Sequence, residues 1–176
     1  WKGRVWVVDP LDGTKYYVRG MEWFSVNIAL CEHGEPVLGV VHLPVTGETY
    51  IARRAEGAYV LVGKRCVKLH VTGKRSLRGV TDVLRMNLGE RKPYDALVNA
   101  FLQEERAASV IGAGAALKIV EIARGNADVL VNPSLDVKKW DTAAAQVVLE
   151  EAGGRITTLD GKPLDYTKRS PVWSTS

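Results

Sequence analysis

The stretch that decides the fold is Val5-Trp6-Val7-Val8-Asp9-Pro10-Leu11-Asp12-Gly13-Thr14, an apolar run that ends in two carboxylates and a Gly-Thr corner. The run predicts a buried strand that delivers Asp9 and Asp12 to one point. Carboxylate oxygens bind Mg²⁺, and free backbone N–H groups at Gly13 and Thr14 can meet phosphate oxygens. Taken alone, however, Asp-Pro and Asp-Gly favour the plainer interpretation of an ordinary turn.

A second acidic position, Asp141, lies at the start of a helix predicted over Trp140–Ala152, which Gly153 and Gly154 end. A carboxylate at that position caps free N–H groups and is favoured by the helix dipole. Taken alone, this capping role is the preferred interpretation of Asp141. The two acidic segments become informative when they are considered together.

Together they resemble the signature motifs of the inositol monophosphatase superfamily of Mg²⁺-dependent, lithium-sensitive phosphatases. Residues 9–14 match Asp-Pro-x-Asp-Gly-Thr, and residues 140–154 match Trp-Asp-x-Ala-Ala followed by Glu-Ala-Gly-Gly. Residues 114–118 and 123–128 are similar to the family's Gly-Ser-x-Leu-Lys and Gly-x-Ala-Asp segment, with Ala115 where the family often has Ser. Residues 138–142 and 161–166 look most like the 3'(2'),5'-bisphosphate nucleotidases of this family.

The order of predicted elements indicates an α+β fold. Strands are expected at 5–8, 24–30, 37–43, 48–53 and 57–62 as an antiparallel meander, with short strands at 128–131 and 172–174. Helices are expected over Tyr94–Glu105, Ala115–Ala123 and Trp140–Ala152. The resemblance implies a layered αβαβα sandwich, in which residues 1–105 form the larger antiparallel-sheet unit and 106–176 a smaller α/β unit of one compact catalytic domain.

The resemblance also implies a metal site. Asp9, Asp12 and Asp141 would hold one Mg²⁺ ion, and Asp9 with the backbone carbonyl of Leu11 would help to hold another. Two metals divide the labour, because one activates a water while the other stabilises the leaving oxygen and the developing phosphate charge.

Contacts to the substrate follow from the same resemblance. Gly13 and Thr14 would donate backbone N–H groups to the phosphate, and the Thr14 hydroxyl would orient the attacking water. Lys118 is a candidate contact to a second phosphate or to the sugar; a solvated lysine on an amphipathic helix is the open alternative. Lys138 and Lys139 are expected to face solvent; screening of the acidic cluster is the open alternative.

The implied activity is Mg²⁺-dependent removal of the 3'-phosphate from adenosine 3',5'-bisphosphate, or from its sulfated form, by two- or three-metal activation of water. Two alternatives stay open: an inositol 1-phosphate or fructose 1,6-bisphosphate phosphatase with the same metal core, and an inactive anion- or nucleotide-binding module. The family carries a metal-binding glutamate and a helical layer upstream of its first Asp motif, and a last helix at its other end. We therefore expect this sequence to be part of a longer polypeptide, lacking the N-terminal helical part of the fold.

Composition agrees with a globular enzyme: 46% of the 176 residues are hydrophobic and 25% are charged. No apolar run approaches the roughly 20 residues that span a membrane, there is no leader pattern, and Cys31 and Cys66 are too few for a disulfide scaffold. We expect a cytoplasmic protein with no membrane partner. The net charge of +4 favours a multiply phosphorylated small substrate. Nucleic-acid binding is not expected because zinc-ligand spacings and RNP-like strands are missing, and a homodimer is compatible with the family.

Overall fold

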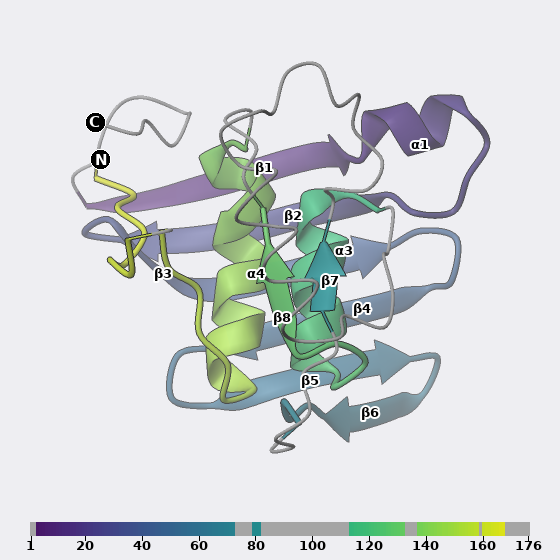
Figure 1. Cartoon of the computed structure of the whole chain (residues 1–176). Coiled ribbons are helices and arrows are strands. Elements are labelled where there is room, and N and C mark those ends of the chain that lie inside the picture. Colours follow the sequence, from purple (N-terminus) through teal and green to yellow (C-terminus); the bar gives the residue numbers. More distant parts are fainter. Residues whose placement is uncertain (1–2, 73–78, 82–112, 133–136, 159, 168–176) are drawn as a thin grey trace.

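The computed structural model describes residues 3–72, 79–81, 113–132, 137–158 and 160–167 (Figure 1). Its main feature is a six-stranded antiparallel sheet in which the strands follow one another in sequence order. The strands are β1 (Arg4–Asp12), β2 (Ser25–Glu32), β3 (Glu35–Leu43), β4 (Glu48–Arg53), β5 (Gly57–Val62) and β6 (Arg65–Lys68). The predicted meander is therefore confirmed, and β6 extends it by one strand.

The other elements among the described residues are three helices and a small parallel sheet. Their bounds are α1 (Thr14–Val18), α3 (Ala115–Ala123), α4 (Lys139–Glu151), β7 (Gly79–Thr81) and β8 (Val129–Val131), with β7 paired to β8 in parallel. The helix predicted at 115–123 has the bounds expected, and α4 begins one residue before the prediction. The predicted helix at 94–105 and strand at 172–174 lie outside the described residues. The α+β class is confirmed, whereas the division into units 1–105 and 106–176 stays a prediction.

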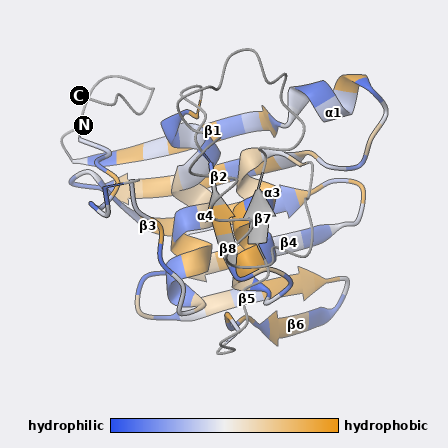
Figure 2. Cartoon of the chain, viewed as in Figure 1, coloured by the Kyte–Doolittle hydropathy of each residue, from blue (hydrophilic) through white to orange (hydrophobic). Residues whose placement is uncertain are grey.

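Helix α4 lies across one face of the six-stranded sheet, with α3 beside it (Figure 1). Along the strands, hydrophilic and hydrophobic residues alternate (Figure 2), as expected where successive side chains point to opposite faces. The face toward α4 is apolar at its centre, and the helix meets it with small residues. The buried side chains that form this contact include Val7, Ala29, Val41, Tyr50, Ala144 and Val148.

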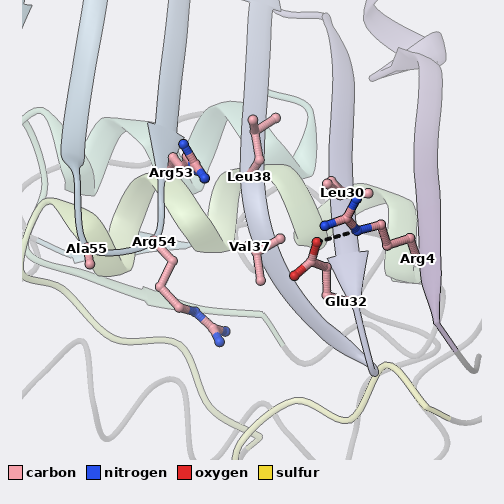
Figure 3. Close-up of a pocket in the computed structure, with 8 residues that line it drawn as sticks. All are labelled: Arg4, Leu30, Glu32, Val37, Leu38, Arg53, Arg54 and Ala55. Atoms are coloured by element: carbon pink, nitrogen blue, oxygen red, sulfur yellow. Dashed lines mark ion pairs between the residues drawn. The ribbon is translucent and has the colours of Figure 1, made fainter.

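The opposite face of the sheet is more open. Trp6 is 61% exposed and Val8 is 49% exposed, and both point away from α4 because they alternate with the buried residues of β1. A shallow pocket on this face carries the exposed ion pair between Arg4 and Glu32, whose charged atoms are 2.7 Å apart (Figure 3). Its lining residues are Arg4, Leu30, Glu32, Val37, Leu38, Arg53, Arg54 and Ala55.

Both cysteines are free thiols, Cys31 buried and Cys66 exposed, as their number and spacing predict. Within the described residues, no helix combines the length and the hydropathy that crossing a membrane requires.

Gly39 of β3 allows the sheet and α4 to approach closely, because a Cβ atom there would overlap the main-chain carbonyl of Ala144. We expect Gly39→Ala to lower the free energy of unfolding by about 3 kcal/mol or more, the upper part of the cost of overpacking. Urea denaturation measures this loss. Gly47→Ala is the control: nothing lies within 4 Å of that position, so only its left-handed φ of 71° counts, at about 1–2 kcal/mol. Equal losses in the two variants would contradict the close approach.

Candidate metal centre

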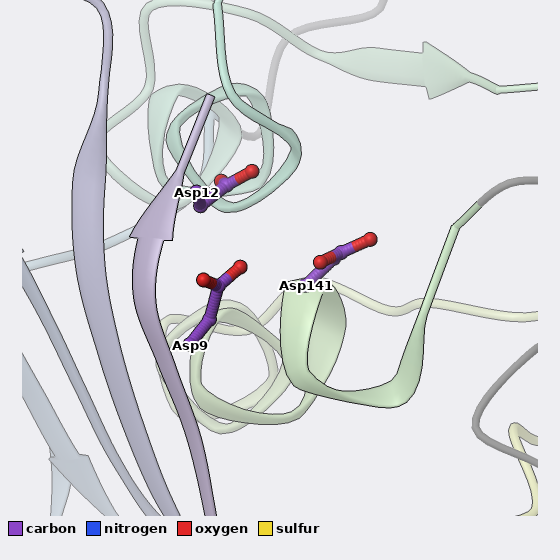
Figure 4. A group of neighbouring side chains, drawn as sticks. All are labelled: Asp9, Asp12 and Asp141. Carbon is purple, nitrogen blue, oxygen red and sulfur yellow. The ribbon is translucent and has the colours of Figure 1, made fainter. Parts of the chain in front are cut away.

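Three carboxylates meet at one point on the α4 side of the sheet: those of Asp9, Asp12 and Asp141 (Figure 4). One oxygen from each lies within 4.8 Å of the others. Asp9 and Asp12 are only 8% and 7% exposed. Asp9 and Asp12 come from the end of β1, whereas Asp141 comes from the first turn of α4, far along the sequence. Hard oxygen donors gathered in this way are a ligand set that fits a divalent cation such as Mg²⁺.

An irregularity in β1 places Asp9 and Asp12 on the same face. In a regular strand, residues three apart point to opposite faces. The pairing of β1 with β2 shifts between Asp9, which lies opposite Asn27, and Asp12, which lies opposite Ser25. Pro10, which has no N–H to donate to a ladder, lies within the shift. The Asp-Pro segment therefore bends the strand so that both carboxylates reach the buried side, as β-bulges do.

The carboxylate of Asp12 also holds the start of α3. Its Oδ1 accepts the Ala115 N–H at 3.1 Å, and its Oδ2 accepts the Ala116 N–H at 2.8 Å. These are the first N–H groups of the helix, which have no acceptor within the helix itself. Gly114 makes the approach possible, since a Cβ there would lie 2.6 Å from Asp12 Oδ2. One acid thus links the end of β1 to the N-terminus of α3.

The other two carboxylates are also oriented by main-chain N–H groups. Asp9 Oδ1 accepts the Leu11 N–H at 3.0 Å, and Asp141 Oδ2 accepts the Lys138 N–H at 2.7 Å. Asp141 is therefore a cap of α4 as well as a member of the cluster, so the two interpretations of this residue are compatible. In Asp9 and in Asp141, a main-chain N–H thus holds one carboxylate oxygen.

The positions of the Asp12 and Asp141 carboxylates disfavour their ionisation. Burial, followed by the negative charges of Asp12 and Asp9, raises the pKa of Asp141 from 3.8 to about 7, against the lowering effect of the Lys138 N–H. Burial also raises the pKa of Asp12, although the N–H groups of Ala116 and Ala115 and the charge of Lys118 lower it. Burial and like charge both disfavour ionised carboxylates. A divalent cation reverses this effect because its charge stabilises the ionised forms.

Two lysines lie deeper than the sequence indicates. Lys118 of α3 is 2% exposed and close enough to influence Asp12, so the alternative of a solvated lysine is wrong. Lys139 is 1% exposed, and the expectation that it faces solvent is also wrong. It is the first residue of α4, one helical turn before the buried Thr142 and Ala143, and so lies on the buried side of the helix. Lys138, just before the helix, is partly buried.

The corner after β1 brings the other predicted residues to the same end of the strand. Gly13 has a φ of 85°, and a Cβ on it would lie 2.9 Å from the Trp23 carbonyl oxygen, so glycine is required there. Thr14 begins α1, and its hydroxyl donates to the Leu11 carbonyl at 3.0 Å. A carbonyl oxygen has two lone pairs, so the Leu11 oxygen keeps one for a further partner.

Sequence reasoning missed two buried polar residues beside the cluster, Ser25 and Asn27 of β2. Ser25 Oγ lies 3.5 Å from Asp12 Oδ2 and 3.0 Å from Asn27 Oδ1. The strand was predicted, and its alternation carries the missing signal. Ser25 and Asn27 occupy the same register as the buried, non-polar Ala29 and Cys31, and polar residues in a buried register need a polar partner.

Comparisons with known proteins identify the family. The model of the Inositol monophosphatase family matches residues 1–176. A 3'(2'),5'-bisphosphate nucleotidase CysQ of Shigella flexneri is 38% identical over 167 residues, which cover 94% of this chain and 63% of the relative. A histidinol-phosphatase of Mycobacterium tuberculosis is 37% identical over 161 residues, covering 90% of this chain and 60% of the relative.

A solved structure gives the same result. The crystal structure of CysQ from Bacteroides thetaiotaomicron superposes with a TM-score of 0.81 and 28% identity, covering 96% of this chain and 67% of that one. The chain thus spans a little under two thirds of the length of the curated relatives it matches. Sequence motifs, fold and carboxylate cluster lead to one conclusion: this chain belongs to the inositol monophosphatase family.

Proposed function

We propose that the protein is a Mg²⁺-dependent phosphoric monoester hydrolase that removes the 3'-phosphate from adenosine 3',5'-bisphosphate or its sulfated form. The observation that carries the proposal is that the buried carboxylates of Asp9 and Asp12 meet the partly buried carboxylate of Asp141 in a chain of this family. The substrate follows from the relatives that are named 3'(2'),5'-bisphosphate nucleotidases.

Asp9, Asp12 and Asp141 are the proposed ligands of Mg²⁺, with the Leu11 carbonyl and Asp9 contributing to a second ion. When bound, such ions acidify a coordinated water and neutralise the charge of the transferring phosphate. The chain's own contribution is to hold the carboxylates in place through the main-chain N–H groups that they accept. Phosphoryl transfer depends on this kind of positioning more than on covalent chemistry.

The Gly13–Thr14 corner is proposed to bind the phosphate through its two backbone N–H groups. Thr14 has a further role that its hydrogen bond supports. Its hydroxyl proton is donated to the Leu11 carbonyl, which leaves the oxygen lone pairs to accept a proton from a water. The hydroxyl would then turn the lone pair of that water toward the phosphorus atom.

Lys118 remains the proposed contact to the second phosphate or to the sugar. Lys118 is buried, and its charge lowers the pKa of Asp12, although less than the N–H groups of Ala116 and Ala115 do.

Turnover of a substrate panel tests the proposal. We expect kcat/KM for adenosine 3',5'-bisphosphate to exceed the values for inositol 1-phosphate, fructose 1,6-bisphosphate and histidinol phosphate by about 10-fold or more, since contacts to the second phosphate and base discriminate in the transition state. Omitting Mg²⁺ should abolish all four activities. A preference for another member of the panel would contradict the proposed substrate. Binding of the compounds without turnover would show that the protein is an inactive binding module instead.

A further inference from the structure

Two buried polar side chains of β2, Ser25 and Asn27, lie next to the carboxylate cluster, and their hydrogen bonds are not all satisfied. Ser25 and Asn27 are 0% and 1% exposed. Ser25 lies opposite Asp12 in the strand pairing, and Asn27 lies opposite Asp9. Among the described residues, the Nδ2 atom of Asn27 is a buried donor without an acceptor. A buried polar group of this kind is costly and calls for a functional explanation.

The Ser25 hydroxyl has one proton and two acceptors within reach. Asn27 Oδ1 is 3.0 Å from its oxygen, and Asp12 Oδ2 is 3.5 Å away. Turning the Asn27 amide end for end resolves the conflict. Nδ2 then donates to Ser25 Oγ, and the Ser25 proton is free for the carboxylate, which is the stronger acceptor because it is charged. The orphaned donor is removed, and a carbonyl oxygen, whose lack of a partner costs less, takes its place.

We propose that Ser25 and Asn27 form a buried relay, Asn27 Nδ2 to Ser25 Oγ to Asp12 Oδ2, that positions Asp12 for cation binding. The relay rests on the proposed function, in which Asp12 is a cation ligand. Ser25 and Asn27 are positioning residues, since they act through Asp12.

The relay determines which oxygen of Asp12 faces the cation. Asp12 Oδ2 accepts the Ala116 N–H at 2.8 Å and, through the relay, the Ser25 proton. Within the described part of the chain, Asp12 Oδ1 accepts only the Ala115 N–H. Each carboxylate oxygen offers about two acceptor directions. The relay thus fills Oδ2 and leaves one direction of Oδ1 for the cation, while three donors stop the carboxylate from rotating.

Cation affinity tests the relay directly. We expect Ser25→Ala to weaken Mg²⁺ binding to the metal-free protein by about 10- to 100-fold, the usual effect of removing a group that orients a metal ligand. Isothermal titration calorimetry measures this without reference to activity. Ser25→Thr keeps the hydroxyl and should restore the affinity. Asn27→Ser, which removes the amide with little change in polarity, should weaken binding in the same direction.

A kinetic readout separates positioning from general destabilisation. If the relay acts only on cation binding, Ser25→Ala should shift the Mg²⁺ concentration for half-maximal activity upward, and kcat should return at saturating Mg²⁺. Cys31→Ala is the matched control, because Cys31 is equally buried on the same face of the same strand. It should lower the melting temperature without changing Mg²⁺ affinity.

The outcomes distinguish the relay from the proposed function. Ser25→Ala that binds Mg²⁺ within about twofold of the wild type, or no more weakly than Cys31→Ala, overturns the relay. The variant Asp12→Asn shows whether the relay alone is wrong or the proposed metal site as well. If Asp12→Asn loses Mg²⁺ binding while Ser25→Ala does not, the relay alone is wrong. If Asp12→Asn also binds normally, Asp12 is not a ligand, and the proposed metal site fails with it.

Discussion

Replacing Asp141 by asparagine is expected to lower turnover by more than about 100-fold, since loss of a direct ligand exceeds the 10- to 100-fold effect of losing an orienting group. Asparagine has the same shape, and its carbonyl oxygen can still accept the Lys138 N–H that begins α4. The helix should therefore persist, which far-ultraviolet circular dichroism checks. What is lost is one negative charge and one anionic oxygen of the three-carboxylate cluster.

For the same variant, we expect a gain in stability although turnover is lost. Without Mg²⁺ at pH 8, Asp141→Asn should melt at a higher temperature than the wild type, because it removes repulsion by Asp9 and Asp12. Asp160→Asn is the control: Asp160 is an exposed acid paired with Lys162, and it should leave turnover unchanged. Near-normal turnover of Asp141→Asn would mean that Asp141 only caps α4, and that it does not bind a cation together with Asp9 and Asp12.

Much of the fold could be predicted because its signals are local. The meander strands alternate regularly, and α3 combines apolar residues at helical spacing with a stop at Gly125. Three elements were missed: β6, α1 and the short strand β7, which has only three residues in which to show a pattern. All four residues of β6 are exposed, so no buried register marks the strand. Helix α1 contains aromatic and β-branched residues that disfavour helices, and packing, such as that of Tyr16 edge-on to Trp23, stabilises it instead.

The site could be predicted only in part from the sequence, because its geometry depends on segments that are far apart in the chain. The motif identifies Asp9 and Asp12, but their spacing alone places them on opposite faces of a strand. Only the pairing shift against β2 brings them together. Likewise, the Ala115 and Ala116 amides that hold Asp12 belong to a helix that is far along the chain. The burial of Lys139 also depends on how α4 lies on the sheet, which charge patterns in the sequence do not reveal.

The affinity for Mg²⁺ is expected to rise about 10-fold per pH unit up to about pH 7 and to level off above it, because one proton must leave when the cation binds. The pKa of Asp141 is raised to about 7 by burial and by Asp12 and Asp9. Below that value the cluster holds the proton, and the cation must displace it. Calorimetric titrations at several pH values, in buffers of different ionisation enthalpy, measure both the affinity and the number of protons released.

Titration of Asp141 should also affect the stability of the metal-free protein. Here the effect of pH is opposite: stability falls as the pH rises, whereas the affinity for Mg²⁺ increases. The pKa of Asp141 is about 7 in the folded chain and near its usual 3.8 when unfolded. Between these values the folded state binds more protons, so stability falls as the pH rises through this window and levels off above about 7. Mg²⁺ should then raise the melting temperature more at pH 8 than at pH 5. Subtracting the metal-free profile of Asp141→Asn isolates this group from other titrations. If the stability difference between wild type and Asp141→Asn is constant from pH 5 to 8, Asp141 does not bind a proton in this range. No proton at Asp141 would then compete with the cation.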